Sequence, residues 1–176
     1  METPLTLTYL NEDDRAYGLA GMALSLAAYD AMDRISSISL DEDGPMVTFS
    51  NEYYFSGSPS ISPKSTWLNL LHNYRITSAM AIANIMSRAM VRMKQEVPSD
   101  LLEEIHQGIL YEGEETCGLE ADEIEDIYGR LLTHSRRIFG NPRVHPAVDA
   151  LARIIARRRT LSGREVIDEI SLLRPF

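Results

Sequence analysis

The sequence predicts a mainly α-helical fold, a helical bundle with a small antiparallel β-meander at about 35–56 between the first and second long helices. Three observations carry this expectation. Several long stretches place apolar residues at helical spacing and are bounded by helix-capping residues. One shorter stretch alternates apolar and polar residues, as half-buried strands do. With 176 residues and 44% apolar composition, the chain suits one domain, 1–176, around one hydrophobic core.

The first helix is expected from Asn11 to about Arg34. Asn11 suits the N-cap position, and three acidic residues follow it, where negative charge stabilises the positive end of the helix dipole. Alanines at spacings of three and four residues then mark one face: Ala16, Ala20, Ala23, Ala27 and Ala31. Such a small-residue face predicts the close approach of another helix.

The meander follows this helix. Ile38 and Leu40 alternate with serines, which predicts a strand, and residues 41–44 carry turn chemistry. Residues 46–50 and the aromatic-rich residues 52–55 continue the pattern, so we expect a meander of two or three strands in all.

The remaining helices are predicted from periodicity and end signals. A long helix over about 63–94 begins at a proline, is apolar nearly all round in its middle, and should be buried. The others are expected at 99–112 with Gly113 as the end, at about 120–139, at 146–159, and after Ser162. Ser162 and Glu165 form a capping box, with Leu161 and Val166 placed as its hydrophobic staple.

Charge is unevenly distributed along the chain. Residues 1–129 carry 22 acids and 7 bases, whereas residues 130–176 carry 4 acids and 10 arginines. Between 96 and 126 lie twelve acids and no base. This asymmetry predicts either that the basic C-terminal helices pack across the acidic segment, or that their arginines bind an anionic partner. The arginines of that patch are Arg153, Arg157, Arg158, Arg159 and Arg164.

Composition also limits the cellular setting. The single cysteine, Cys117, excludes an intrachain disulfide and a four-cysteine zinc site. The first residues show no leader pattern, and no uninterrupted apolar stretch is long enough for a membrane span. We therefore expect a cytoplasmic protein with no membrane association.

Candidate catalytic and metal-binding residues are few. Glu103 and His106 form one Glu-x-x-His pair, but a di-iron bundle requires two such pairs. The other histidines lack metal-ligand spacing: His72, His134 and His145. Cys117 lies among acids, which disfavour a reactive thiolate, although pairing with a histidine in space stays open. We expect no metal and no cofactor.

The segment 15–24 reads Arg-Ala-Tyr-Gly-Leu-Ala-Gly-Met-Ala-Leu. It resembles the active-site helix of the FtsH-type ATP-dependent zinc metalloproteases, whose core is Ala-Tyr-His-Glu-Ala-Gly-His-Ala-Leu. Gly18 and Met22 stand at the two histidine positions, and Leu19 stands at the glutamate position. In that family the histidines bind zinc from one helix face, and the glutamate takes a proton from the metal-bound water.

Further segments are similar to the same family. Residues 78–91 fit the helix that supplies the aspartate ligand, keep its Ala-x-x-x-x-Arg-x-Met-Val frame, and place Ala79 at the ligand position. Residues 150–166 are similar to the family's closing Leu-Ala-x-x-Leu-Leu-x-x-Glu-Thr-Leu-x-Gly-x-Glu-Ile, and residues 122–127 resemble part of the helix before it. The matches touch about half of the chain.

The resemblance implies a peptidase-like domain that has lost its zinc ligands and general base, and is therefore catalytically inactive. We expect a protein-binding, peptide-binding or assembly module, with an AAA-type ATPase supplied in trans as a candidate partner and a homo-oligomer as a further arrangement. In that family a strand beside the cleft pairs with the substrate. The matching residues, expected to bind peptide here, are Ser36, Ser37, Ile38, Ser39 and Leu40.

Two alternatives stay open, and a third is disfavoured. An active zinc metallopeptidase could use substitute ligands drawn from His72, His106, His134 or an acid. The chain could instead be an unrelated helical interaction domain. Residues 146–173 also look like a helix–turn–helix, but three acids on the second helix would repel a phosphate backbone, so we expect no nucleic-acid partner.

Overall fold

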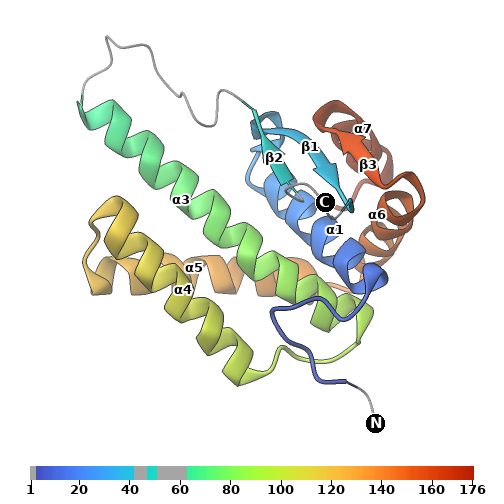
Figure 1. Ribbon diagram of the computed structural model, residues 1–176, viewed down its shortest axis with the longest axis horizontal. Helices are drawn as coiled ribbons and strands as arrows, with labels where there is room; N and C mark the ends of the chain where they lie inside the picture. Colours follow the sequence, from blue (N-terminus) through green and yellow to red (C-terminus); the bar gives the residue numbers. More distant parts are fainter. Residues whose placement is uncertain (1–2, 42–46, 51–62) are drawn as a thin grey trace.

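The computed structural model describes residues 3–41, 47–50 and 63–176. It confirms a mainly α-helical fold with a small three-stranded antiparallel sheet (Figure 1). The helices are α1 (Glu12–Ala28), α3 (Pro63–Met86), α4 (Ser99–Cys117), α5 (Ala121–Phe139), α6 (His145–Arg158) and α7 (Gly163–Leu173). A 3₁₀ turn, Met32–Arg34, follows α1, and a π-helical segment, Ser87–Arg92, continues α3.

The sheet combines strands from both ends of the chain. Strand β1 (Ile35–Ser39) pairs with β2 (Val47–Phe49) as the meander pattern predicts, and also with β3 (Thr160–Ser162). The strand order is therefore β2-β1-β3, with β1 in the centre. The sequence did not indicate β3, because three residues are too few to show alternation. The strand expected at 52–55 lies outside the described residues.

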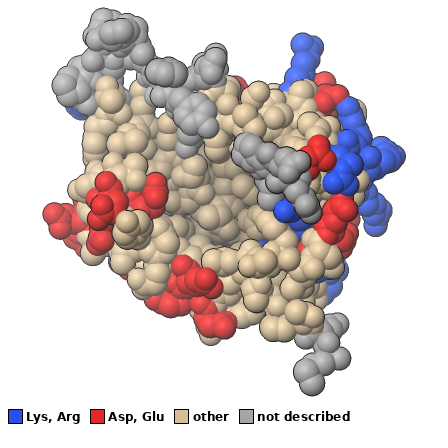
Figure 2. Space-filling view, viewed as in Figure 1, with Lys and Arg blue, Asp and Glu red and all other residues tan. Residues whose placement is uncertain are grey.

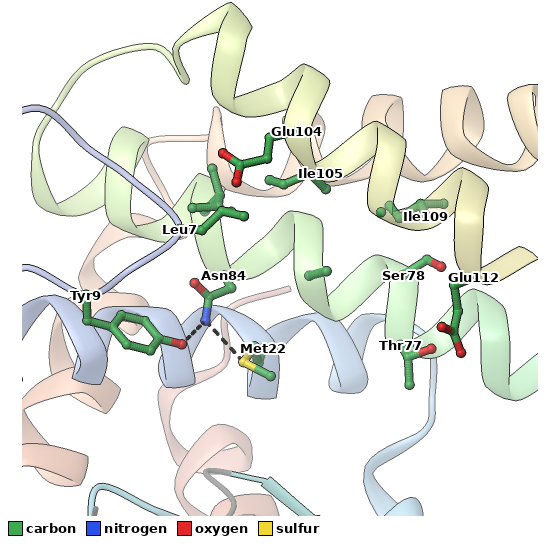
Figure 3. Close-up of a pocket in the computed structure, with 13 residues that line it drawn as sticks. Leu7, Tyr9, Met22, Thr77, Ser78, Asn84, Glu104, Ile105, Ile109 and Glu112 are labelled. Carbon is green, nitrogen blue, oxygen red and sulfur yellow. Dashed lines mark hydrogen bonds between the residues drawn. The ribbon is translucent and has the colours of Figure 1, made fainter.

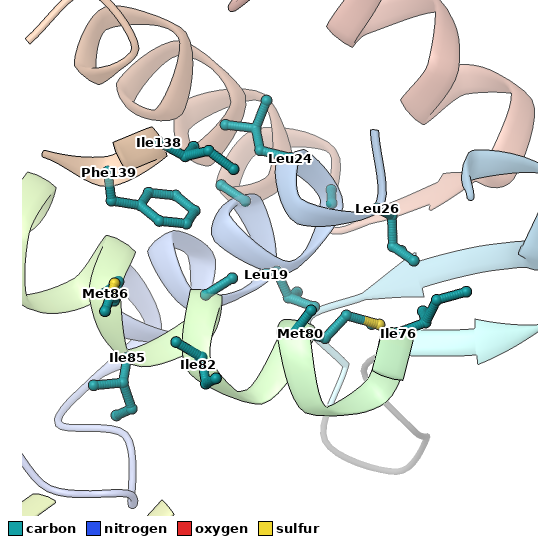
Figure 4. Packing of buried hydrophobic residues seen from close by; sticks show 14 of the residues in the cluster. Leu19, Leu24, Leu26, Ile76, Met80, Ile82, Ile85, Met86, Ile138 and Phe139 are labelled. Atoms are coloured by element: carbon teal, nitrogen blue, oxygen red, sulfur yellow. The ribbon is translucent and has the colours of Figure 1, made fainter. Parts of the chain in front are cut away.

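On the alanine face of α1, Ala16, Ala20 and Ala23 are buried and Ala27 is partly buried. Helix α1 packs on α3 on one side and on α6 on the other. Gly21 shows how close the first contact is, since a Cβ there would lie 2.6 Å from the backbone oxygen of Ala83. Larger side chains fill the space around this crossing (Figure 4). They include Leu19 and Leu24 of α1 and Met80 of α3, all buried. The small-residue stripe is thus a packing feature, as its spacing predicts.

Three helix ends differ from the sequence prediction. The long helix expected to reach about residue 94 is α-helical only to Met86 and π-helical to Arg92. The first helix ends at Ala28, and a separate 3₁₀ turn covers the last residues assigned to it. The helix expected to stop at Gly113 continues to Cys117 and ends at Gly118, which has a left-handed φ of 62°. Gly113 is needed for packing instead, because a Cβ there would lie 2.6 Å from the Tyr74 hydroxyl oxygen. A glycine is therefore not a sufficient signal for the end of a helix, because it can also be required by close packing.

The start of α7 agrees with its sequence signature. Ser162 Oγ accepts a hydrogen bond from the Glu165 backbone N–H at 3.2 Å, and Glu165 Oε2 accepts one from the Ser162 N–H at 2.8 Å. The staple residues Leu161 and Val166 are both buried. A second capping box, between Glu120 and Glu123, begins α5.

The basic C-terminal helices do not pack across the acidic 96–126 segment, so that prediction is wrong. Helices α6 and α7 lie against α1 and each other, whereas α4 and α5 lie against α3. Arg158 pairs with Glu165. Arg159 pairs with Glu12 and with Asp41, which follows β1. Figure 2 shows the separation, with blue surface on the α6–α7 side and red surface on the α4 side. Total charge along the sequence does not specify which helices become neighbours.

Within the described ranges, no helix is both long and apolar enough to cross a lipid bilayer.

Candidate functional site

A groove of about 600 Å³ opens between α1, α3, α4 and the residues that precede α1, 3–11, which we call the N-terminal segment. It is visible as a hollow in Figure 2 and in close-up in Figure 3. Thirteen residues line it: Leu7, Tyr9, Met22, Thr77, Ser78, Ala81, Asn84, Ile85, Glu104, Ile105, Gly108, Ile109 and Glu112. Its volume is within the range of sites that bind small molecules or the side chains of a partner.

Small and apolar residues form most of the groove surface. Ala81 of α3 and Gly108 of α4 are exposed, and a Cβ added at Gly108 would meet nothing within 4 Å. Ile105 and Ile109 follow the same side of α4 and are buried at its junction with the rest of the fold. Helical walls with small residues allow a partner backbone to approach closely, and the more exposed Leu7 and Met22 offer it apolar contact area.

One end of the groove is polar. The Asn84 side-chain amide donates a hydrogen bond to Tyr9 Oη at 2.8 Å and lies 3.3 Å from Met22 Sδ (Figure 3). Burial raises the pKa of Tyr9, so its phenol stays protonated at neutral pH. This end thus presents neutral hydrogen-bonding groups beside a flexible thioether, which adapts readily to different apolar shapes.

A buried ion pair fastens the N-terminal wall of the groove. Arg88 Nη2 and Nε donate to the two carboxylate oxygens of Asp14 at 2.5 Å and 2.9 Å, and both side chains are fully buried. Arg88 also donates to the Thr8 carbonyl at 3.1 Å and lies 4.7 Å from the centre of the Tyr9 ring. Asp14 accepts the Leu10 N–H at 2.9 Å. The pair therefore fixes the segment that carries two groove residues.

Sequence reasoning used both partners of this pair for other purposes. Asp14 counted as one of the acids that favour the start of α1, and Arg88 counted as a position shared with the metalloprotease frame. The available signal was a single arginine inside the otherwise uncharged and mostly apolar stretch 78–91, since a buried charge requires a partner.

The four positions that correspond to the zinc-site residues of the metalloproteases have two different environments. Met22 lines the groove, and Gly18 packs against Asn84, since a Cβ on Gly18 would lie 2.7 Å from the amide nitrogen. Leu19 and Ala79 are fully buried in the core. The two histidine positions thus face α3 at Asn84, whereas the glutamate and aspartate positions are covered by packed side chains.

The proposed substitute ligands are not brought together. His106 stacks on Tyr128 and lies 2.7 Å from Glu125. His134 packs against the ring of Tyr29, and His72 is exposed. In the described part of the chain, no three His, Cys, Asp or Glu side chains are grouped so that they could hold a metal ion. Burial, with a smaller contribution from a nearby glutamate, raises the pKa of Cys117, as expected of a thiol that is not activated.

The segment 36–40, expected to bind a peptide at a free strand edge, belongs mostly to the central strand of the sheet, and β1 is paired on both sides. Ser37 is paired with Thr48 on one side and with Ser162 on the other. The next residue, Ile38, is likewise flanked on both sides and is buried. An added peptide strand would have to displace β2 or β3. The alternation at 36–40 identifies a strand correctly, but it does not indicate whether that strand lies at the edge or in the centre of a sheet.

The five arginines of the predicted anion-binding patch differ in whether they form ion pairs within the protein. All five of its members are exposed. Arg158 and Arg159 are engaged by acids of the same chain, as described above. For Arg153, Arg157 and Arg164, the described residues contain no ion-pair partner within 4.0 Å. These three arginines remain the candidates for contact with an anionic partner.

The segment resembling a helix–turn–helix has a different connection from that motif. Helices α6 and α7 are joined through β3, which belongs to the sheet. No tight turn of the kind found in that motif sets their angle.

Comparison with known proteins adds no family assignment, because no protein-family model and no curated protein matches the chain. The resemblance to FtsH-type metalloproteases therefore rests on the quoted residues alone. What the groove can bind is therefore inferred from the side chains that line it.

Proposed function

We propose that the protein is a catalytically inactive, peptidase-like module that binds a segment of another protein in the groove between the N-terminal segment, α3 and α4. The observation that carries this proposal is an open groove of about 600 Å³ with an apolar lining and a small-residue wall. Exposed apolar surface of this kind marks binding sites in folded proteins. An AAA-type ATPase supplied in trans is one candidate partner.

The lack of catalysis is supported by the groups present at the matching positions. Gly18 and Ala79 offer no ligand, Leu19 cannot move a proton, and the Met22 thioether is a soft ligand that suits zinc poorly. The rival proposal of an active zinc peptidase makes a distinct prediction. Purified protein would then contain near-stoichiometric zinc and cleave casein, and either result together with loss on chelation would overturn the inactive assignment.

Groove binding is tested by selecting peptides from a random displayed library on the wild-type protein. The selected peptides are then titrated against a groove variant, Gly108→Phe, and a control, Gly129→Phe. Both glycines are exposed on a helix, and a Cβ at either would meet nothing within 4 Å, but only Gly108 lines the groove. We expect the phenylalanine at 108 to abolish binding and the one at 129 to leave it unchanged.

Peptides that bind both variants equally would place binding elsewhere on the molecule. An absence of any selected peptide, with the wild type correctly folded, would contradict the peptide-binding proposal itself.

A further inference from the structure

Two carboxylates stand on the α4 side of the groove. Glu104 and Glu112 are eight residues apart, which places them on one helix face about 12 Å apart along the axis. Gly108, halfway between them, leaves the face open. Figure 3 shows Glu104 on the same side as Leu7, and Glu112 reaching toward Thr77 on α3. The two charges therefore bracket the apolar part of the groove.

Neither carboxylate is neutralised by the described part of the protein. The ion pairs of α4 and α5 involve Glu103, Glu125 and Asp126 instead. Glu112 accepts a hydrogen bond from Thr116 at 2.9 Å, which leaves its charge uncompensated. Among the described residues, no lysine, arginine or histidine lines the groove. An apolar groove with two unpaired carboxylates favours a ligand that brings positive charge to both.

The walls of the groove favour a helical ligand over an extended one. An added strand gains most of its affinity from backbone hydrogen bonds with a free sheet edge. Here both long walls are helices, α3 and α4, whose interior N–H and C=O groups are already bonded within each helix. A helix satisfies its own backbone and inserts side chains at intervals of three and four residues, so it needs only side-chain contacts from the groove.

We propose that the ligand of this groove is a basic amphipathic helix, with lysine or arginine at two positions seven or eight residues apart and apolar side chains between them on the same face. The proposal rests on the function proposed above and adds the chemistry of the partner. Seven or eight residues of helix rise about 10–12 Å, which matches the separation of Glu104 and Glu112. The intervening apolar side chains lie against Leu7, Met22 and Ala81.

The test uses three synthetic 18-residue helical peptides that share leucines on one face. They differ only at positions 6 and 13, which are both lysine, both glutamine or both glutamate. Fluorescein-labelled peptides are titrated by anisotropy at low and high salt against three proteins. These are the wild type, a groove reversal (Glu104→Lys with Glu112→Lys), and a control reversal (Glu114→Lys with Glu115→Lys) that changes net charge equally outside the groove.

We expect the lysine peptide to bind the wild type about tenfold more tightly than the glutamine peptide, because two partly exposed charge pairs each contribute modestly. Salt should weaken this preference. The groove reversal should remove it and transfer it to the glutamate peptide, whereas the control reversal should leave it nearly unchanged. Transfer of preference identifies these two carboxylates as the contacts.

Several outcomes would overturn the inference. Equal binding of the lysine and glutamine peptides, with both lost in Gly108→Phe, would mean that the groove binds apolar helices without reading charge, and the proposed function would stand. Equal loss in the two reversals would assign the effect to net charge. If none of the three peptides binds while library peptides still require Gly108, the ligand is not a basic helix. If library peptides fail as well, both proposals fall.

Discussion

Removing one charge of the Asp14–Arg88 pair should destabilise the protein more than any surface change. The perturbation is Asp14→Asn, which keeps the side-chain shape and an acceptor for the Leu10 N–H but leaves Arg88 without its counter-charge. Both side chains are fully buried, so water cannot replace the lost interaction. Breaking a buried pair in this way costs about 3–5 kcal/mol.

The magnitude can be read from urea denaturation followed by circular dichroism. With a slope of about 2 kcal/mol per molar urea, a loss of about 4 kcal/mol lowers the unfolding midpoint by about 2 M. The matched control is Asp13→Asn, the same chemical change one residue earlier. Asp13 pairs with Arg92 at 2.8 Å but is largely exposed, so its loss should cost about 1 kcal/mol or less.

A double-mutant cycle decides whether the effect belongs to the pair. Arg88→Met removes the cation, and the double variant with Asp14→Asn leaves no unpaired charge. The double variant should therefore be at least about 2 kcal/mol more stable than the sum of the single losses predicts. Two results would refute the conclusion that this pair holds the N-terminal segment in place. One is additive losses in the cycle, and the other is a loss in Asp14→Asn no larger than in Asp13→Asn.

Three further predictions follow from packing and burial. Gly113→Ala should destabilise the protein by about 1–3 kcal/mol because its Cβ would clash with packed side chains, whereas Gly108→Ala should stabilise α4 by up to about 1 kcal/mol in the same denaturation assay. Leu19→Glu should prevent stable folding by burying a charge in the core, whereas Met22→Glu on the groove should be tolerated, as compared by thermal melting. Burial, followed by a hydrogen bond to a carboxylate, raises the pKa of Tyr17 to about 12. Its contribution to stability is therefore complete below about pH 10 and is lost as the pH rises toward 12, and Tyr17→Phe should flatten the fall in unfolding free energy over that window.

Local features of the fold could be predicted from the sequence. The start of α1 at Asn11, the capping box at Ser162 and the burial of the middle of α3 all appear in the structure. Each depends on residues within about one turn of each other, or on a periodicity that one helix displays by itself. The same local reasoning failed at Gly113, because the reason for that glycine is a tyrosine on another helix.

The candidate site could be predicted only in part. Reasoning from the sequence singled out Met22 as a position of interest, and Met22 does line the groove. It did not find Glu104, Gly108 or Glu112, although their spacing on one helix face was readable. The sequence does not indicate that α3 lies opposite this face of α4, nor that a groove remains between the two helices.

By itself, the sequence determined a mainly helical chain with a short β segment, the ends of most helices, and the uneven distribution of charge. The tertiary structure alone decided that β3 flanks β1, that Asp14 meets Arg88, and that basic and acidic helices lie apart. These relations join residues that lie far apart in the sequence, such as Asp14 with Arg88 and Ser37 with Ser162. Capping and periodicity act between near neighbours, whereas distant pairs are selected by the packing of the whole core, where every element competes for the same apolar surface.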